Sequence, residues 1–237
     1  MQVIAHRGAS AVKPENTLTA IEQALALNVS AIELDVHLLH DQGEKHLVIM
    51  HDRYVDGTTN GVGRITDHSY AHLRGLDAGM GQQIPVLQEA LACISGRCEV
   101  HIELKNEGAV PLVLSEINDF ISTNIFTEDQ FVISSFDHLQ LIECQQIQPS
   151  IRRGALIAHI PHDLASFTDN LGLYSLNLSI NCINKALVDD AHQRGLKVLV
   201  YTVDKPADIE QMLTYKVDGI FSNAPDAALN YITEQHG

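Results

Sequence analysis

Short runs of apolar, mostly β-branched residues alternate with stretches of helical periodicity along nearly the whole chain. The runs with the length of strands lie at residues 3–6, 31–36, 99–105, 131–135, 153–157, 174–178, 197–203 and 218–221. The helical stretches between them lie near residues 17–27, 87–95, 110–123, 137–146, 162–170, 185–194, 206–215 and 224–235. Strands that alternate with helices predict a parallel sheet with helical crossovers. Eight such units predict an α/β fold, the (β/α)8 TIM barrel, with an open doubly wound sheet as the alternative because periodicity does not show closure.

The segment 46–86 interrupts this alternation. Residues 46–51 have the pattern of an additional strand, and a glycine-rich excursion follows it. A loop of this length inside a compact domain is usually functional or forms a small subdomain. In a barrel it would follow the second strand, on the face where active sites form. We therefore predict one barrel domain over residues 1–237, with a small insertion at about 52–86.

Composition and charge narrow the class of protein. The 237 residues are 45% hydrophobic and 19% charged, which is ordinary for a globular protein. With 15 basic and 30 acidic residues, the formal charge is −15, so we expect no nucleic-acid partner and no attraction to anionic membranes. The sequence has neither an apolar run of about 18 residues nor the pattern of a signal peptide, so we expect a cytoplasmic protein without stable membrane insertion.

The four cysteines also favour a cytoplasmic location. They form no CxxC pair, and free thiols in a reducing environment are the simplest interpretation. A zinc site formed by Cys93, Cys98 and His101 is not favoured, because this spacing fits no zinc-finger pattern.

Two predicted strands carry charged residues where buried parallel strands should be apolar. The polar residues that alternate with apolar ones are Glu33, Asp35 and His37 in one strand and His101, Glu103 and Lys105 in the next. A period of two puts each set on one face, so adjacent strands can bring Glu33, Asp35 and Glu103 together. Like carboxylates share a buried site only with a cation, and three oxygen ligands favour Ca²⁺ or Mg²⁺ over zinc. The alternative is that these carboxylates point to solvent at exposed strand ends.

Two histidines end strands that border this acidic set. His6 closes the first predicted strand, and His51 closes the additional strand. Histidines that flank a metal-bound phosphate can act as general base and general acid. Most of the 13 histidines, His40 and His236 among them, are expected to take no part in the reaction.

A series of short motifs runs in order through nearly the whole chain. The motifs are His6-Arg7-Gly8, Pro14-Glu15-Asn16-Thr17, Glu33-Leu34-Asp35, His51-Asp52, Thr58-Thr59 with Gly61 and Gly63, Ile84-Pro85-Val86-Leu87-Gln88-Glu89, Glu103-Leu104-Lys105, Tyr201-Thr202-Val203-Asp204 and Asp218-Gly219-Ile220-Phe221. Together they resemble the glycerophosphodiester phosphodiesterase family. The combination is highly specific, although each motif alone is weak.

The resemblance implies a barrel with an insertion after the second strand and one bound divalent cation, Ca²⁺ or Mg²⁺. It implies an acid/base pair of histidines and two basic residues near the substrate phosphate. The implied residues are His6 and His51 as the pair, Arg7 and Lys105 at the phosphate, Glu33, Asp35 and Glu103 as metal ligands, and Glu15 and Asn16 in support. Asn16 is also expected to cap the first helix, because it precedes Thr17 and Leu18.

Several positions depart from the family's usual residues. Gly57 precedes Thr58 where a basic residue is frequent, and Tyr201 and Asp204 stand where Trp and Asn are frequent. Ser222 and Asn223 replace a common Thr-Asp. We expect these positions to lie at the substrate end and to influence the preferred alcohol group.

The reaction implied is metal-assisted hydrolysis of a small glycerophosphodiester to glycerol 3-phosphate and an alcohol. Either histidine can serve as the base, and the nucleophile is water or the neighbouring glycerol hydroxyl. Lys105 shares a strand face with Glu103, so it either stabilises charge on the phosphate or pairs with the carboxylates. The rival functions are lysophospholipase D activity on lipid diesters, which needs an apolar entry, and a non-catalytic barrel that binds phosphodiesters.

Overall fold

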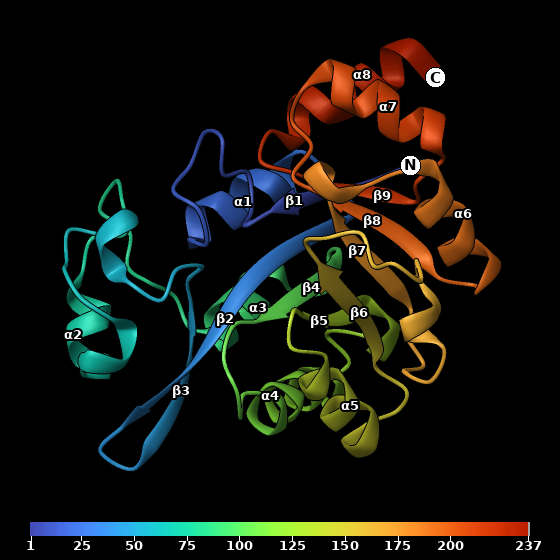
Figure 1. Ribbon diagram of the computed structural model, residues 1–237. Coiled ribbons are helices and arrows are strands. Elements are labelled where there is room, and N and C mark those ends of the chain that lie inside the picture. Colours follow the sequence, from blue (N-terminus) through green and yellow to red (C-terminus); the bar gives the residue numbers. More distant parts are fainter. Residues whose placement is uncertain (237) are drawn as a thin grey trace.

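Eight parallel strands close into a barrel, as the sequence predicts (Figure 1). The computed structural model describes the backbone of residues 1–236 and the side chains of residues 1–234; Gly237 and the side chain of His236 lie outside the described residues. The barrel strands are β1 (Gln2–His6), β2 (Ala31–Asp41), β4 (Glu99–Leu104), β5 (Phe131–Ser135), β6 (Arg152–Ile157), β7 (Ser175–Ser179), β8 (Lys197–Tyr201) and β9 (Gly219–Ser222). Because β1 pairs with both β9 and β2, the sheet is closed and the open-sheet alternative is wrong.

Helices cover the outside of the barrel. They are α1 (Leu18–Ala26), α3 (Leu87–Ile94), α4 (Val110–Ser122), α5 (His138–Ile147), α6 (Lys185–Gln193), α7 (Pro206–Tyr215) and α8 (Pro225–His236). Their starts follow local chemistry: the Asn184 side chain accepts a hydrogen bond from the backbone of Leu187, and Pro206 occupies the first turn of α7. Within residues 1–236, no helix has the length and apolar character needed to cross a bilayer.

The helix predicted near residues 162–170 is wrong. This segment contains one 3-10 turn, Ser166–Thr168, in place of a helix. Leu164 has φ of +55°, a left-handed conformation that ends any helical turn before it. The Thr168 hydroxyl then donates to the carbonyl of Ala165 at 2.7 Å, which is the local bonding that favours turns over helices.

The predicted cap at Asn16 is also wrong. Thr17 caps α1, because its side chain accepts a hydrogen bond from the backbone of Ala20. Asn16 is buried and faces the barrel instead: its amide donates to Asp35 Oδ2 at 2.9 Å, and its carbonyl oxygen accepts from the Asp35 backbone at 3.3 Å. A cap residue and a residue that supports the site are thus neighbours in the chain.

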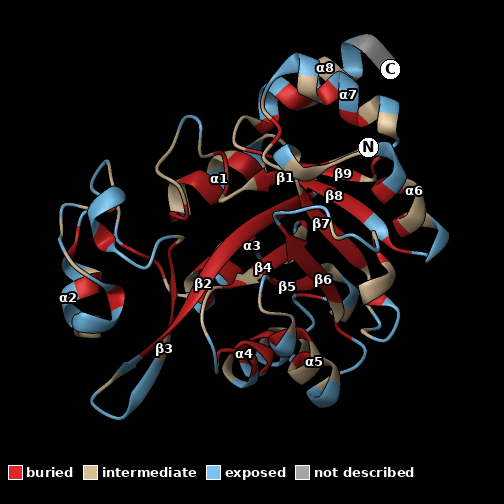
Figure 2. Cartoon of the chain, viewed as in Figure 1, coloured by how far each residue is buried: buried red, intermediate tan, exposed pale blue. Residues whose placement is uncertain are grey.

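The main core lies between the outer faces of the strands and the helices. Figure 2 shows the barrel strands buried along most of their length and the outer surfaces of the helices exposed. Inside the barrel, a small apolar cluster of Ile4, Ala31, Leu199 and Phe221 packs together, with Tyr201 against it. Burial of the apolar side chains of the main core supplies the main driving force for folding. The polar residues of β2 and β4 are therefore exceptions to the pattern of the interior.

The insertion follows a hairpin whose second strand corresponds to the additional strand predicted at residues 46–51. Strand β3 (Glu44–Ile49) pairs antiparallel with the long outer half of β2, and the insertion then contains α2 (Tyr70–Gly75) and two 3-10 turns, Val55–Gly57 and Ile65–Asp67. Figure 1 shows α2 beside the barrel, next to β3. A second core forms between the insertion and the β2–β3 hairpin, built from Leu39, Val48, Met50, Val55, Ile65, Leu73, Leu76, Ala78 and Ile84. Most large apolar side chains of the insertion are therefore used for packing.

Candidate active site

The loop after β1 brings His6 and Arg7 to the mouth of the barrel. Gly8 has φ of +80°, and a Cβ placed there would lie 2.6 Å from the backbone of Ala20 in α1. The third residue of His6-Arg7-Gly8 must therefore be glycine, because the loop packs directly on the helix. Arg7 is itself left-handed, with φ of +57°, and its backbone N–H donates to Glu33 Oε2 at 3.0 Å.

The three predicted metal ligands lie together inside the barrel. Asp35 of β2 is paired in register with Glu103 of β4, and Glu33 lies two residues before Asp35 on the same face. One oxygen atom from each carboxylate lies within 4.8 Å of the others. The side chains of Glu33, Asp35 and Glu103 are 5%, 1% and 12% exposed, so the alternative in which they point to solvent is wrong.

This donor set fits a hard divalent cation. Glu33 Oε1 is buried and has no hydrogen-bond partner among residues 1–236. A buried carboxylate oxygen without a donor costs free energy unless a cation faces it. Three carboxylates from two adjacent strands supply the oxygen ligands that Ca²⁺ and Mg²⁺ prefer.

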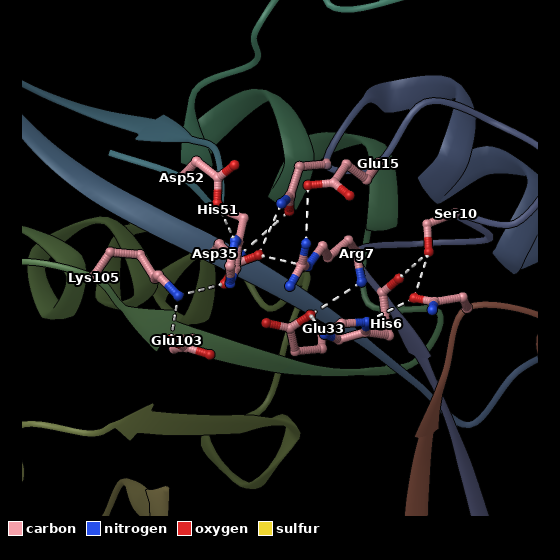
Figure 3. Close-up of polar contacts among 12 residues, drawn as sticks. His6, Arg7, Ser10, Glu15, Glu33, Asp35, His51, Asp52, Glu103 and Lys105 are labelled. Carbon is pink, nitrogen blue, oxygen red and sulfur yellow. Dashed lines mark hydrogen bonds and ion pairs between the residues drawn. The ribbon is translucent and has the colours of Figure 1, made fainter. Parts of the chain in front are cut away.

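Two cationic side chains hold the carboxylates together, as Figure 3 shows. Lys105 Nζ lies 2.5 Å from Glu103 Oε1 and 3.3 Å from Asp35 Oδ1. On the other side, Arg7 Nε lies 3.1 Å from Asp35 Oδ2, and its Nη1 donates to Glu15 Oε1 at 3.0 Å. Glu15 thus contacts the guanidinium of Arg7, and Asn16 bonds to Asp35. Asn16 therefore supports the acidic cluster directly, and Glu15 supports it through Arg7.

The cluster carries more negative charge than these cations offset. Burial and the neighbouring carboxylates of Asp35 and Glu103 raise the pKa of Glu33 well above its usual value. Burial and the charge of Asp35 likewise raise the pKa of Glu103. Burial opposes ionisation of Asp35 as well, but Lys105 and Arg7 hold the pKa of Asp35 below its usual value. A further cation at Glu33 and Glu103 would therefore be electrostatically favourable.

His51 lies just after β3, on the insertion side of the mouth. Its Nδ1 is 2.7 Å from Asp52 Oδ1, and its backbone carbonyl is 3.2 Å from His37 Nε2. His37 lies on the polar face of β2, where the sequence indicates no role for it, and its ring contacts the backbone carbonyl of His51. The contact of Asp52 with the His51 ring is likewise not predictable from the spacing of residues.

His6 ends β1 with its ring largely buried. Its Nε2 faces Glu33 Oε2 at 3.9 Å, and its Nδ1 lies 2.7 Å from Asn223 Oδ1. Burial and the adjacent Arg7 charge lower the pKa of His6 to about 4. Asn223 is in turn bonded to Asp204. Asp204 and Asn223, expected at the substrate end, therefore lie behind His6 instead.

A cavity of about 120 Å³ opens between these groups at the carboxyl ends of the strands. Its lining residues are His6, Arg7, Glu33, His51, Glu103, Ser134, Phe136, Leu156, Asn177, Tyr201, Thr202 and Phe221. Lys105 is not among the described residues that line it. The side opposite the carboxylates is largely apolar, and there the Phe136 and Tyr201 rings meet edge to face with centroids 6.1 Å apart. Neither Phe136, directly after β5, nor Leu156, within β6, is predicted from the sequence, because apolar residues in or next to buried strands carry no distinguishing signal.

The comparisons with known proteins agree with this arrangement. Residues 6–227 match the model of the glycerophosphoryl diester phosphodiesterase family. A glycerophosphodiester phosphodiesterase of Caldanaerobacter subterraneus is 35% identical over 97% of this chain and 97% of its own length. One from Bacillus subtilis is 30% identical over 94% of this chain and 83% of its own.

Solved structures of similar proteins have the same fold. A phosphodiesterase of Oleispira antarctica, in complex with the product sn-glycerol-3-phosphate, is 29% identical and superposes with a TM-score of 0.87 over 98% of this chain and 97% of its own. A glycerophosphodiester phosphodiesterase of Agrobacterium tumefaciens is 26% identical, with a TM-score of 0.78 over 97% and 99% of the two chains. The chain therefore belongs to the glycerophosphoryl diester phosphodiesterase family.

Proposed function

We propose that this protein is a phosphoric diester hydrolase that cleaves glycerophosphodiesters to glycerol 3-phosphate and an alcohol in a metal-dependent reaction. One observation carries the proposal: three carboxylates, two of them buried and the third largely so, converge with two histidines and Arg7 beside one small cavity at the mouth of a TIM barrel. In such barrels, residues at the carboxyl ends of the strands carry the chemistry. The named activity of the relatives supports the same reaction.

Glu33, Asp35 and Glu103 would hold the divalent cation, Ca²⁺ or Mg²⁺. When bound, such an ion neutralises phosphate oxygens and the charge that develops on them. Arg7, which lines the cavity, adds a fixed positive charge that burial does not remove, because Asp35 and Glu33 raise its pKa. A protein of charge −15 repels an anionic substrate at long range, so this local positive centre is needed for binding.

His6 and His51 would move the protons. One takes a proton from the nucleophile as its oxygen bonds to phosphorus. The nucleophile is water, or the glycerol hydroxyl next to the phosphate, in which case water must then open the cyclic phosphate to give glycerol 3-phosphate. The other gives a proton to the leaving alcohol as its bond to phosphorus breaks. Both rings line the cavity. We assign Lys105 a supporting part at the phosphate, through the two carboxylates that it contacts.

The dimensions of the cavity favour a small water-soluble diester. Its volume of about 120 Å³ is below the roughly 300 Å³ at which pockets for larger ligands begin. A lysophospholipid would need an apolar path for its acyl chain, and most large apolar residues of the insertion are buried in the second core, against the β2–β3 hairpin. The Oleispira antarctica relative was solved with sn-glycerol-3-phosphate, which supports a substrate of this size. A non-catalytic barrel would be expected to lack a ligand or a histidine, and each is present here.

We propose that residues 1–237 act as one catalytic domain in the cytoplasm. The four cysteines, Cys93, Cys98, Cys144 and Cys182, are free thiols, as suits a reducing compartment. Burial raises the pKa of Cys98 to about 12 and that of Cys144 to about 11, so these two thiols are unreactive.

The experiment is a panel of diesters assayed with the purified protein, with and without a chelator. Glycerophosphocholine and glycerophosphoethanolamine should release glycerol 3-phosphate, and lysophosphatidylcholine should be cleaved far more slowly. Chelation should abolish the activity, and Ca²⁺ or Mg²⁺ should restore it. Full activity after exhaustive chelation would contradict metal dependence, and preferred cleavage of lysophosphatidylcholine would replace the proposed substrate with a lipid.

A further inference from the structure

The side-chain amide of Asn223 has one possible orientation. Asn223 directly follows β9, and its Nδ2 lies 2.8 Å from Asp204 Oδ2. Asp204 Oδ1 also accepts from the Asn223 backbone N–H at 2.7 Å and from the Ser222 hydroxyl at 2.9 Å. A carboxylate accepts hydrogen bonds and does not donate them. The nitrogen of the amide must therefore face Asp204, and its oxygen must point the opposite way.

That oxygen faces His6. Asn223 Oδ1 lies 2.7 Å from His6 Nδ1, and the Ser10 hydroxyl lies 2.9 Å from the same oxygen. An amide oxygen only accepts, so His6 Nδ1 must donate. A neutral imidazole has one ring proton, which this contact keeps on Nδ1. The lone pair then lies on Nε2, the atom that faces Glu33 in the cavity.

We propose that Asp204 and Asn223 form a relay that fixes the tautomer and ring orientation of His6, so that His6 exchanges protons with the substrate at Nε2. The inference rests on the proposed function, which gives His6 a proton-transfer role. Asp204 and Asn223 are positioning residues, because they act through His6. His51 is held differently, since its Nδ1 meets the carboxylate of Asp52 directly at 2.7 Å. The Nδ1 atoms of the two histidines are thus held by unlike supports.

The Asp204→Asn variant tests the relay, because it replaces the obligate acceptor by an amide. Asn223 is then free to turn its Nδ2 toward His6, which permits the tautomer protonated on Nε2. We expect kcat to fall at least tenfold with KM little changed. The loss should stay below the roughly 10⁴-fold found when an amide replaces the carboxylate that directly contacts a catalytic histidine. Asp226→Asn, at an exposed site in α8, is the control and should leave kcat unchanged.

The double exchange Asp204→Asn with Asn223→Asp should rescue the activity. The carboxylate then faces His6 Nδ1, and the amide at position 204 can donate to it while its oxygen accepts from the backbone. We expect kcat within a few-fold of the parent protein. A merely structural role for Asp204 would give no such recovery, so an exchange variant no more active than Asp204→Asn overturns the relay.

Ring ¹⁵N chemical shifts of His6 in the metal-loaded protein give a readout that does not depend on turnover. The parent protein should show the tautomer protonated on Nδ1, and Asp204→Asn should show a mixture. An unchanged tautomer in Asp204→Asn overturns the relay. His6→Ala, assayed in parallel, separates the two hypotheses: near-normal turnover in that variant contradicts the proton-transfer role of His6, whereas the chemical shifts still decide whether Asp204 and Asn223 set its tautomer.

Discussion

The two halves of the barrel mouth are built from equivalent strand ends but from opposite chemistry. The half formed by β1, β2 and β4 carries His6, Arg7, Glu33, Asp35 and Glu103, all in contact with another charged or titratable group. The half formed by β5 to β9 presents Ser134, Phe136, Leu156, Asn177, Tyr201 and Phe221 to the same cavity. One half can hold a cation and move protons, whereas the residues of the other half that line the cavity offer shape and neutral contacts, with Asn223, bonded to Asp204, behind them in contact with His6.

The difference between the two halves shows which part of the mouth lowers the stability of the fold. Burial of carboxylates and the repulsion between them oppose folding, and both effects raise the pKa values of Glu33 and Glu103. The apolar half has no such cost, because burial of Leu156 and Phe221 favours the folded state. We therefore expect changes in the charged half to affect the reaction strongly, and changes in the apolar half to affect substrate binding weakly.

The largest effect is expected for the metal ligands. Glu103→Gln removes one of three oxygen donors and should weaken Ca²⁺ or Mg²⁺ binding by more than about 100-fold, because even groups behind a metal ligand are worth roughly 10- to 100-fold. Activity should fall to background, while the barrel stays folded because the change relieves repulsion. Titration calorimetry measures the affinity, and thermal unfolding checks the fold.

A buried carboxylate outside the mouth provides the matched control. Glu116 lies on α4, and burial raises its pKa to about 7. Glu116→Gln should leave metal affinity and turnover unchanged. Unaltered metal affinity in Glu103→Gln would show that the ligands are assigned wrongly. A loss of metal affinity in both variants would show that the effect is not specific to the carboxylates of the mouth.

The histidines come next. His6→Ala and His51→Ala should each lower turnover by about 10²- to 10⁴-fold, the range for loss of a general acid or base. His40→Ala changes an exposed histidine at the far end of β2 and should have almost no effect. Single-turnover rates at saturating metal make the measurement. If His51→Ala keeps near-normal turnover, the acid/base pair is not the one proposed.

The unequal chemistry of the two halves also explains what the sequence reveals. Glu33, Asp35 and Glu103 are predictable because charge every second residue conflicts with a buried strand. Phe136 and Leu156 agree with that pattern, so their place at the cavity is visible only in the folded chain. Asn223 and Asp204 are a third case: their contact depends on the ends of β8 and β9 lying side by side, which spacing along the chain does not encode.

The fold, too, is predictable only where it depends on local periodicity. Alternation of strands and helices predicts the barrel, because each βα unit has a local periodicity. The absent helix near residues 162–170 and the cap at Thr17 depend on the backbone conformation of single residues, Leu164 and Asn16, which both have positive φ. A left-handed conformation occurs at single residues and is rare for leucine, so the periodicity of the sequence does not predict it.

A smaller loss is expected for Lys105→Met. Lys105 Nζ contacts Glu103 and Asp35 rather than the cavity, so we expect turnover and kcat/KM to fall together by roughly tenfold at saturating metal. That is below the 10²- to 10³-fold typical of a donor aimed directly at developing charge. Lys185→Met removes an exposed lysine paired with Asp189 and serves as the control. Unchanged turnover with weaker metal binding would make Lys105 a partner of the carboxylates alone.

The smallest effect is expected in the apolar half. Phe136 lines the cavity and contacts the Tyr201 ring edge to face, yet it is 49% exposed, so Phe136→Ala should not disturb folding. The contact with the Tyr201 ring contributes about 0.5–1.5 kcal/mol, so its loss should lower the free energy of unfolding only slightly and leave the Tyr201 ring less well positioned in the cavity. We therefore expect KM for a glycerophosphodiester to rise about 2- to 10-fold, with kcat and metal affinity unchanged.

Leu139→Ala, at a more exposed apolar residue that is not among those lining the cavity, should leave KM unaltered. Steady-state kinetics with glycerophosphocholine and glycerophosphoethanolamine measure the effect. A fall in kcat as large as that of His6→Ala would mean that the apolar half takes part in the reaction itself and that the mouth is not divided as the side chains suggest.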